Sequence, residues 1–171
     1  MIVQSVPFGA YEYNIMLGAL LFGRGADILS TWVATPNLML EANPLARLLG
    51  WRWGLVFNLA LCFSLACFPL PAVVVVTTSL LVAARNFKTA WLMRAMGEER
   101  YLVFMLNQVN TVNRRLYVFC LLAEGLLTAI VGVVVAYYSK VPSIPLGIGG
   151  GIVAYAVAVV FYSCLSLWRS R

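Results

Sequence analysis

The sequence predicts an all-α, polytopic membrane protein built as a bundle of five transmembrane helices. Hydrophobic residues make up 63% of the 171 residues, compared with about 45–50% in a typical globular protein. Charged residues make up only 11%, compared with about 25%, which is too few to cover the surface of a soluble domain. The apolar residues also fall into five long stretches. We therefore expect the lipid bilayer to be the main partner of the chain.

A transmembrane helix needs about 20 predominantly apolar residues to cross a hydrocarbon core about 30 Å thick. Aromatic residues flank the ends of the apolar stretches, as they do in the aromatic belts of membrane proteins. We expect a single domain over residues 1–171 with a cytoplasmic loop at 97–115 and spans near 13–33, 48–68, 72–94, 116–138 and 146–168.

The second predicted helix has a start signal and a stop signal. Asn43 is a suitable N-cap, and Pro44 suits the first helical position, so this helix begins before it enters the membrane. Pro69 and Pro71 interrupt the apolar sequence further along, because proline has no N–H to donate and restricts the residue before it. The two prolines therefore separate the second span from the third.

The loop at 97–115 contains an apolar run, 101–106, followed by polar residues. Asn107, Asn110 and Asn113 are spaced by three, which would place them on one face of a helix. Two arrangements remain open for this segment. It is either a helix lying at the membrane interface or an exposed cytoplasmic extension of the fourth transmembrane helix.

The distribution of cations predicts the orientation. With five spans only Lys140 falls on one side of the membrane, while ten cations fall on the other: Arg47, Arg52, Arg85, Lys88, Arg94, Arg100, Arg114, Arg115, Arg169 and Arg171. Lys and Arg accumulate on the cytoplasmic side of membrane proteins. We therefore expect an amino terminus outside, a cytoplasmic carboxyl terminus and a multi-pass location in the cell membrane.

Polar side chains recur at similar depth in four spans: Arg24 with Asp27, Asn58, Arg85 and Glu124. Two cations and two anions make a neutral set. A lone charge at the centre of a transmembrane helix costs about 2.5–3.5 kcal/mol or more, so these groups should face the bundle interior and pair. Asp27 could pair with Arg85, Glu124 with Arg24 or Arg85, and Arg24 with Asp27 on its own helix.

This polar layer allows two interpretations. In the first, the ion pairs only hold the helices in register. In the second, they line a site for a solute or a path for protons, which is the default hypothesis for ionisable residues inside a membrane.

Small residues indicate how the last two spans pack. Gly132 and Ala136 continue a stripe that begins at Glu124 and Thr128, two residues that we assign to the candidate ligand site, with a spacing of four. The fifth span has a matching stripe at Gly150, Ala154 and Ala158. Stripes of small residues let membrane helices approach closely, so we expect the fourth and fifth spans to pack along them.

Asp27, Thr31, Glu41, Asn43 and Pro44 form the pattern D-x-x-x-T followed by E-x-N-P. This pattern resembles that of a family of small, uncharacterised bacterial and archaeal integral membrane proteins, and it covers about the first third of the chain. The resemblance implies no activity. It does imply that Glu41 and Asn43 belong to the same cytoplasm-facing cluster as Asp27 and Thr31. A carboxylate is well placed near the start of a helix, where free N–H groups and a partial positive charge occur.

Three functions remain open. The favoured one is the binding or translocation of a small solute, an ion or an amphipathic ligand, such as a lipid, through the polar cluster. The second is a non-catalytic accessory or assembly subunit of a larger membrane complex or homo-oligomer. The third, an intramembrane enzyme that processes lipid or peptide, is less favoured and no catalytic residue is assigned. The chain has no histidine, the usual general base near neutral pH, and no G-x-S-x-G or H-E-x-x-H pattern.

Metal, cofactor and nucleic-acid binding are not expected. The four cysteines lie in apolar stretches and include no C-x-x-C pair, so they do not predict a metal site or a cofactor. The net charge of +6 comes from cations dispersed beside the spans. A nucleic-acid-binding protein would instead have a dedicated basic surface.

Overall fold

A computed structural model describes residues 5–139 and 144–169, and within these ranges the chain is all α-helical, with six helices and no strand. The helices are α1 (Tyr11–Ala34), α2 (Pro44–Leu65), α3 (Pro69–Met96), α4 (Glu98–Val112), α5 (Arg114–Tyr137) and α6 (Ile144–Arg169). The predicted fold class, all-α, is confirmed.

Four of the described helices are long and apolar enough to cross a membrane, namely α2, α3, α5 and α6 over Ile144–Ser166. They indicate a membrane protein. α1 has 24 residues, which is long enough, but Arg24 and Asp27 in its middle lower its mean hydropathy. By length and composition the described chain thus has one spanning helix fewer than the five that the sequence analysis expects.

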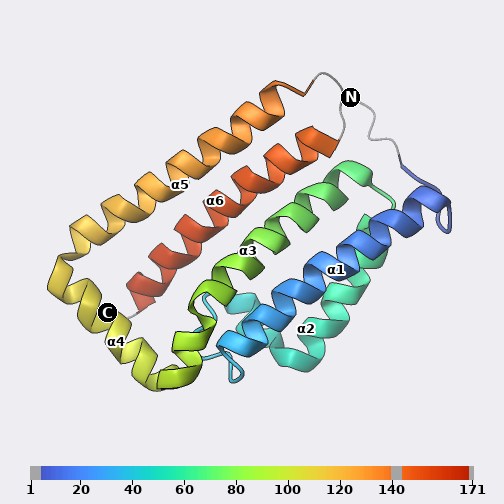
Figure 1. Cartoon of the computed structure of the whole chain (residues 1–171). Helices are drawn as coiled ribbons and strands as arrows, with labels where there is room; N and C mark the ends of the chain where they lie inside the picture. The colour runs from blue at the N-terminus through green and yellow to red at the C-terminus, as the bar shows by residue number, and fades with distance from the viewer. Residues whose placement is uncertain (1–4, 140–143, 170–171) are drawn as a thin grey trace.

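The helices form a row in which α1 packs on α3, α3 packs on α6, and α6 packs on α5 (Figure 1). α2 lies beside α1 and α3 with much less contact, and Cys62 is its buried residue. α4 joins the end of α3 to the start of α5 (Figure 1). α1, α3 and α6 run in one direction, and α2 and α5 run in the other. Because α3 and α6 lie between them, α1 and α5 do not touch.

The local signals around α2 act as the sequence predicts. The Asn43 side chain caps the helix by accepting a hydrogen bond from the backbone N–H of Leu45 at 3.0 Å, and α2 begins at Pro44. α3 begins at Pro69, three residues before the predicted start. Pro69 occupies the first turn of α3, where a missing backbone N–H removes no hydrogen bond within the helix. The proline therefore marks the start of α3 as well as the interruption between the two spans. Gly50 has a φ of 61°, a left-handed conformation that favours glycine, and it kinks α2.

Most of the predicted loop at 97–115 is helical. α4 is a helix of 15 residues that buries Tyr101 and Val109. It ends at Asn113, whose φ of 77° breaks the path into α5 and whose side-chain oxygen accepts from the Arg115 N–H at 3.0 Å. α4 is therefore a separate helix, and the alternative of an extension continuous with the fourth span is excluded.

α5 and α6 pack through glycines that bring the two backbones into contact. A Cβ added at Gly132 would lie 2.7 Å from the carbonyl oxygen of Gly149, and one added at Gly149 would lie 2.8 Å from the Cβ of Ala136. Gly132 and Ala136 thus lie on the predicted packing face of α5. The prediction for α6 needs a correction, because Gly150 lies against Val74 of α3. Neighbouring residues are about 100° apart around a helix, so Gly149 takes the place on the α5 side.

The rest of the predicted α6 stripe follows Gly150. Ala154 and Ala158 are half-buried, and their spacing of four from Gly150 places them on the same side of the helix, toward α3. Gly151 lies on this side too, and a Cβ there would be 2.5 Å from the Cβ of Thr77. The glycine-rich start of α6 therefore packs closely against two neighbouring helices, α5 and α3.

Substituting Gly149 by alanine should destabilise the protein, because the added methyl meets the backbone of α5. Overpacking of this kind costs about 1–3 kcal/mol. The matched control is Gly18→Ala in α1, where an added Cβ has no atom within 4 Å and helix propensity improves. Melting temperatures of the purified proteins in mild detergent check this. Equal melting temperatures for the two variants would contradict the close contact.

Candidate functional site

Arg24 connects α1 to α2 and α3 through its guanidinium group. Nη1 donates to Asp27 Oδ2 at 2.8 Å, which forms an ion pair within α1, and to Ser79 Oγ at 3.1 Å. Nε donates to Asn58 Oδ1 at 2.7 Å, and Nη2 donates to the same oxygen. The Asn58 amide donates in turn to the Gly54 carbonyl at 2.7 Å. Groups from three helices thus satisfy the charges of this cluster inside the protein.

The Arg24 cluster has the geometry of a structural element. The side chains of Arg24 and Asp27 are 26% and 16% exposed, so both are largely withdrawn from solvent. Pairing offsets the cost of burying their charges, and removal of one partner would leave the other uncompensated. The predicted local pair of Arg24 and Asp27 is confirmed. The predicted ion pair of Asp27 with Arg85 is absent from the described chain, because Asp27 already has Arg24 as its counter-ion.

The contact between α1 and α3 continues in the direction of α4. Asn86 on α3 donates from Nδ2 to Ser30 Oγ and to Thr31 Oγ1, each at 3.2 Å. Thr31 thus joins the α1–α3 contact. Further along, the guanidinium carbon of Arg94 lies 5.6 Å from the centre of the Trp32 ring, a cation–π contact. The predicted site residue Thr31 therefore lies between two helices and has its hydroxyl hydrogen-bonded.

Glu98 at the start of α4 holds the segment that follows α1. Its Oε2 accepts hydrogen bonds from Thr35 Oγ1 at 2.5 Å and from the Met39 N–H at 2.9 Å, and its Oε1 accepts from the Asn37 N–H at 2.8 Å. The residue is buried, with 8% exposure. Burial alone would raise the pKa of the Glu98 carboxyl, but the hydrogen bonds stabilise the charged form and hold the pKa below its ordinary value.

Sequence reasoning did not single out Glu98. The available signal is its position in the first turn of a helix, directly after Gly97, where a carboxylate is favoured by the helix dipole. Glu98 and Glu99 share this signal, and only Glu98 is buried. Nothing local to the sequence indicates that its partners lie about 60 residues earlier in the chain.

Glu41 and Asn43 form their own hydrogen bond in the segment between α1 and α2. The Asn43 N–H donates to Glu41 Oε1 at 2.8 Å. Burial raises the pKa of the Glu41 carboxyl, and this hydrogen bond opposes the rise. Glu41 is also close enough to Asp27 for the two carboxyl groups to interact electrostatically. The two residues of the E-x-N-P pattern thus organise the entry to α2 near the Arg24 cluster.

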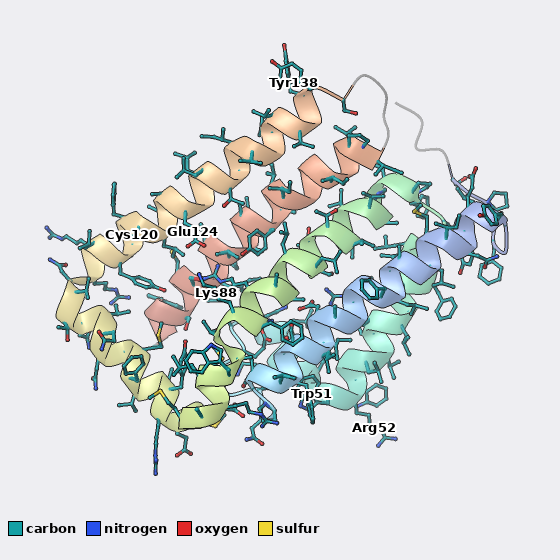
Figure 2. All side chains as sticks on the ribbon, viewed as in Figure 1. Trp51, Arg52, Lys88, Cys120, Glu124 and Tyr138 are labelled. Atoms are coloured by element: carbon teal, nitrogen blue, oxygen red, sulfur yellow. The ribbon has the colours of Figure 1, made fainter. Side chains whose placement is uncertain are left out.

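A cavity of about 130 Å³ contains the other two predicted charges, and its lining residues are Arg85 of α3 with Tyr117, Cys120, Leu121 and Glu124 of α5. Nη1 of Arg85 is buried and has no hydrogen-bond partner among the described residues. Glu124 is exposed. Figure 2 shows Cys120 and Glu124 on α5, in the half of the molecule that lies next to α4.

The predicted charge layer therefore divides into two parts. Glu124 does not reach Arg24, because α3 and α6 separate α5 from α1. Within the described part of the chain, Glu124 and Arg85 form no ion pair, although both line the cavity. Thr128 is not among the residues that line the cavity, and its hydroxyl donates to the Glu124 backbone carbonyl at 2.8 Å. Arg24 and Asp27 of α1 are paired with each other, whereas Arg85 and Glu124 have no such pair among the described residues.

The described residues contain no cluster of three or more His, Cys, Asp or Glu side chains that could hold a metal ion. Comparison with protein-family models found no family that matches this chain. Comparisons with curated proteins and with solved structures also gave no match. The geometry of the chain itself therefore has to support any functional conclusion.

Replacing Glu98 by glutamine should lower the melting temperature at neutral pH, because the amide has only one acceptor oxygen and its NH2 group cannot accept from the donors that the second carboxylate oxygen binds. The folded pKa of Glu98 lies below the ordinary 4.5, so its stabilisation is complete above about pH 4.5 and is lost as the pH falls through the folded value. The difference in melting temperature between wild type and Glu98→Gln should therefore shrink below pH 4.5. The control is Glu99→Gln, an exposed neighbour, and a difference that stays constant down to pH 3 would contradict the hydrogen-bonded carboxylate.

Proposed function

We propose that the protein is a five-span protein of the cell membrane, with its amino terminus outside and its carboxyl terminus in the cytoplasm, that binds an amphipathic ligand in the cavity between α3 and α5. The fifth span in this proposal is α1. Its 24 residues correspond to about 36 Å of helix, more than the thickness of a hydrocarbon core. The paired charges of Arg24 and Asp27 reduce the cost of inserting it.

Packing supports the assignment of α1 as a span. α1 lies along α3, with Gly23 against Val76, Arg24 against Ser79 and Thr31 against Asn86. A helix that runs parallel to a transmembrane helix over this length occupies the same depth of the bilayer. The distribution of cations supports the orientation, since only Lys140 lies on the outer side with five spans.

Reporter fusions check the topology. Alkaline phosphatase fused after Tyr138 should be active, because that point lies outside the membrane, whereas the same enzyme fused after Arg171 should be inactive. A fluorescent protein fused after Arg171 should fluoresce. An epitope at the amino terminus should be accessible to antibody in intact spheroplasts if α1 crosses the membrane. If the antibody reaches this epitope only after the membrane is permeabilised, α1 does not cross the membrane. The protein would then have four spans, and the proposal for α1 would be wrong.

The proposed ligand site rests on one observation, the unpartnered buried guanidinium nitrogen of Arg85 beside a cavity. Arginine has five N–H donors and stays charged inside proteins. An unsatisfied charge in a medium of low dielectric is costly, and a ligand with an anionic group would remove this cost. Arg24 offers much less opportunity, because four of its five N–H donors already bond to Asp27, Asn58 and Ser79. The cavity on α5 is therefore the better candidate of the two polar clusters.

The location of the cavity favours an amphipathic ligand. It lies between two helices of the bundle. α5 exposes Leu127 and Val131, three and seven residues after Glu124 and therefore on the same side of the helix, and they provide an apolar surface for an acyl chain. Arg114 and Arg115 begin α5 one turn before Tyr117, and Lys88 follows Arg85 on α3. These cations would attract an anionic head group to the same end of the bundle.

α2 offers some support for the alternative function, an assembly subunit. Cys62 is the buried residue of α2, while Leu55, Phe57 and Phe63 are exposed. A partner helix could cover this face. Lipid chains satisfy an apolar face equally well, however, so the exposed side of α2 requires no partner, and ligand binding remains the better supported function.

Arg85→Gln should weaken phospholipid binding. Loss of a hydrogen bond to a charged group costs about 1.5–3 kcal/mol, which is about 10- to 100-fold in affinity. The test is native mass spectrometry of delipidated protein titrated separately with dioleoyl phosphatidylglycerol and dioleoyl phosphatidylethanolamine. The control is Arg52→Gln, an exposed cation of α2 (Figure 2). If Arg85→Gln binds each of the two lipids as tightly as wild type does, the proposed site is wrong.

A further inference from the structure

The cavity between α3 and α5 contains opposite charges that do not neutralise each other. Arg85 and Glu124 both line it, and neither side chain makes an ion pair or hydrogen bond within the described part of the chain. This differs from the Arg24 cluster, where the cation and the anion of one helix are 2.8 Å apart. An anionic ligand alone would satisfy Arg85 and leave Glu124 without a counter-ion.

We infer that this cavity recognises a zwitterionic head group that combines a phosphate with a primary ammonium, as in phosphatidylethanolamine. The inference rests on the proposed function and names the ligand class of the same site. Arg85 would bind the phosphate, since the planar guanidinium group matches the geometry of phosphate oxygens. Glu124 would accept hydrogen bonds from the ammonium, which has three donors. Both charges of the site would then be compensated by one neutral molecule.

The other lining groups fit a polar head group of limited size. The volume of about 130 Å³ is close to the ~150 Å³ of a protein cavity that accommodates benzene, so a small head group fits. The Tyr117 hydroxyl can donate to a phosphate oxygen. Leu121 adds an apolar wall.

Exposure of the lining indicates how a lipid would enter. Cys120 and Glu124 are exposed on α5, so the cavity opens at the side of the bundle and not only at its end. A lipid of the inner leaflet could place its head group between the helices while its acyl chains remain along Leu127 and Val131. Free phosphoethanolamine esters have the same charged groups, and the experiment below separates them from the lipid.

The test compares head groups on one protein. Wild type in detergent is titrated with dioleoyl phosphatidylethanolamine, phosphatidylglycerol and phosphatidylcholine, and binding is followed by native mass spectrometry. Phosphatidylethanolamine should bind about tenfold more tightly than either of the others, the effect of one charge-assisted hydrogen bond. Phosphatidylglycerol lacks the ammonium, and the trimethylated ammonium of phosphatidylcholine has no N–H to donate to Glu124. Competition by glycerophosphoethanolamine shows whether the free ester suffices.

Glu124→Gln should abolish the preference for phosphatidylethanolamine over phosphatidylglycerol, whereas Arg85→Gln should weaken the binding of both. Glu124→Asp, which keeps the charge, should retain part of the preference, and Glu99→Gln on α4 should leave it unchanged. A selective loss of phosphatidylethanolamine binding in Glu124→Gln therefore supports the inference independently of any general change in stability.

The outcomes separate the inference from the proposed function. If wild type binds phosphatidylglycerol as tightly as phosphatidylethanolamine and Arg85→Gln weakens both, the zwitterion inference fails and the proposed anion site stands. The inference also fails if Glu124→Gln weakens both lipids equally. If wild type binds none of the three lipids, both proposals fail.

Discussion

The pairing of Arg24 with acceptors on three helices is the interaction on which the rest of the structure depends. α1 has a cation and an anion in its middle, and the ion pair with Asp27 and the hydrogen bonds to Asn58 and Ser79 satisfy them. Because these two charges are paired and hydrogen-bonded, α1 can lie against α3 along its length. That contact in turn brings the segment after α1 to the start of α4, where Glu98 binds it. Loss of the guanidinium group would leave Asp27 largely buried without a counter-ion, which is strongly destabilising.

The Arg24 cluster and the cavity at Arg85 also differ in how many arginine N–H donors are already hydrogen-bonded, and this difference separates their roles. Four of the five N–H donors of Arg24 are used within the protein, so this arginine has little left to offer a ligand. Arg85 has the same chemistry and a buried nitrogen without a partner. Two arginines in neighbouring helices thus have different uses, and the difference follows from what faces each of them. Arg24 faces an aspartate one turn away and an asparagine on α2, while Arg85 faces a cavity.

The sequence predicts the local features of this fold well and its packing order poorly. Helix lengths, the Asn43 cap and the start at Pro44 depend on residues close to each other in the chain. The order of helices in the bundle depends on which faces fit together, and hydropathy does not encode it. For this reason the predicted pairing of Glu124 with Arg24 is wrong, because α3 and α6 separate them. The same limit explains Gly150, which lies one residue from the true contact with α5, and Glu98, whose partners are remote in sequence.

The shared direction of α1 and α3 has an electrostatic consequence for their ends. Each helix has a macrodipole with about half a negative charge at its carboxyl end, and parallel neighbours bring two such ends together, where they repel each other. Arg94 is the basic residue in the last turn of α3, and it also stacks on Trp32 near the end of α1. One guanidinium group thus lies near both helix ends, where its positive charge opposes their repulsion. In this protein the same cation therefore also favours the side-by-side arrangement of two helices whose parallel dipoles would otherwise disfavour it.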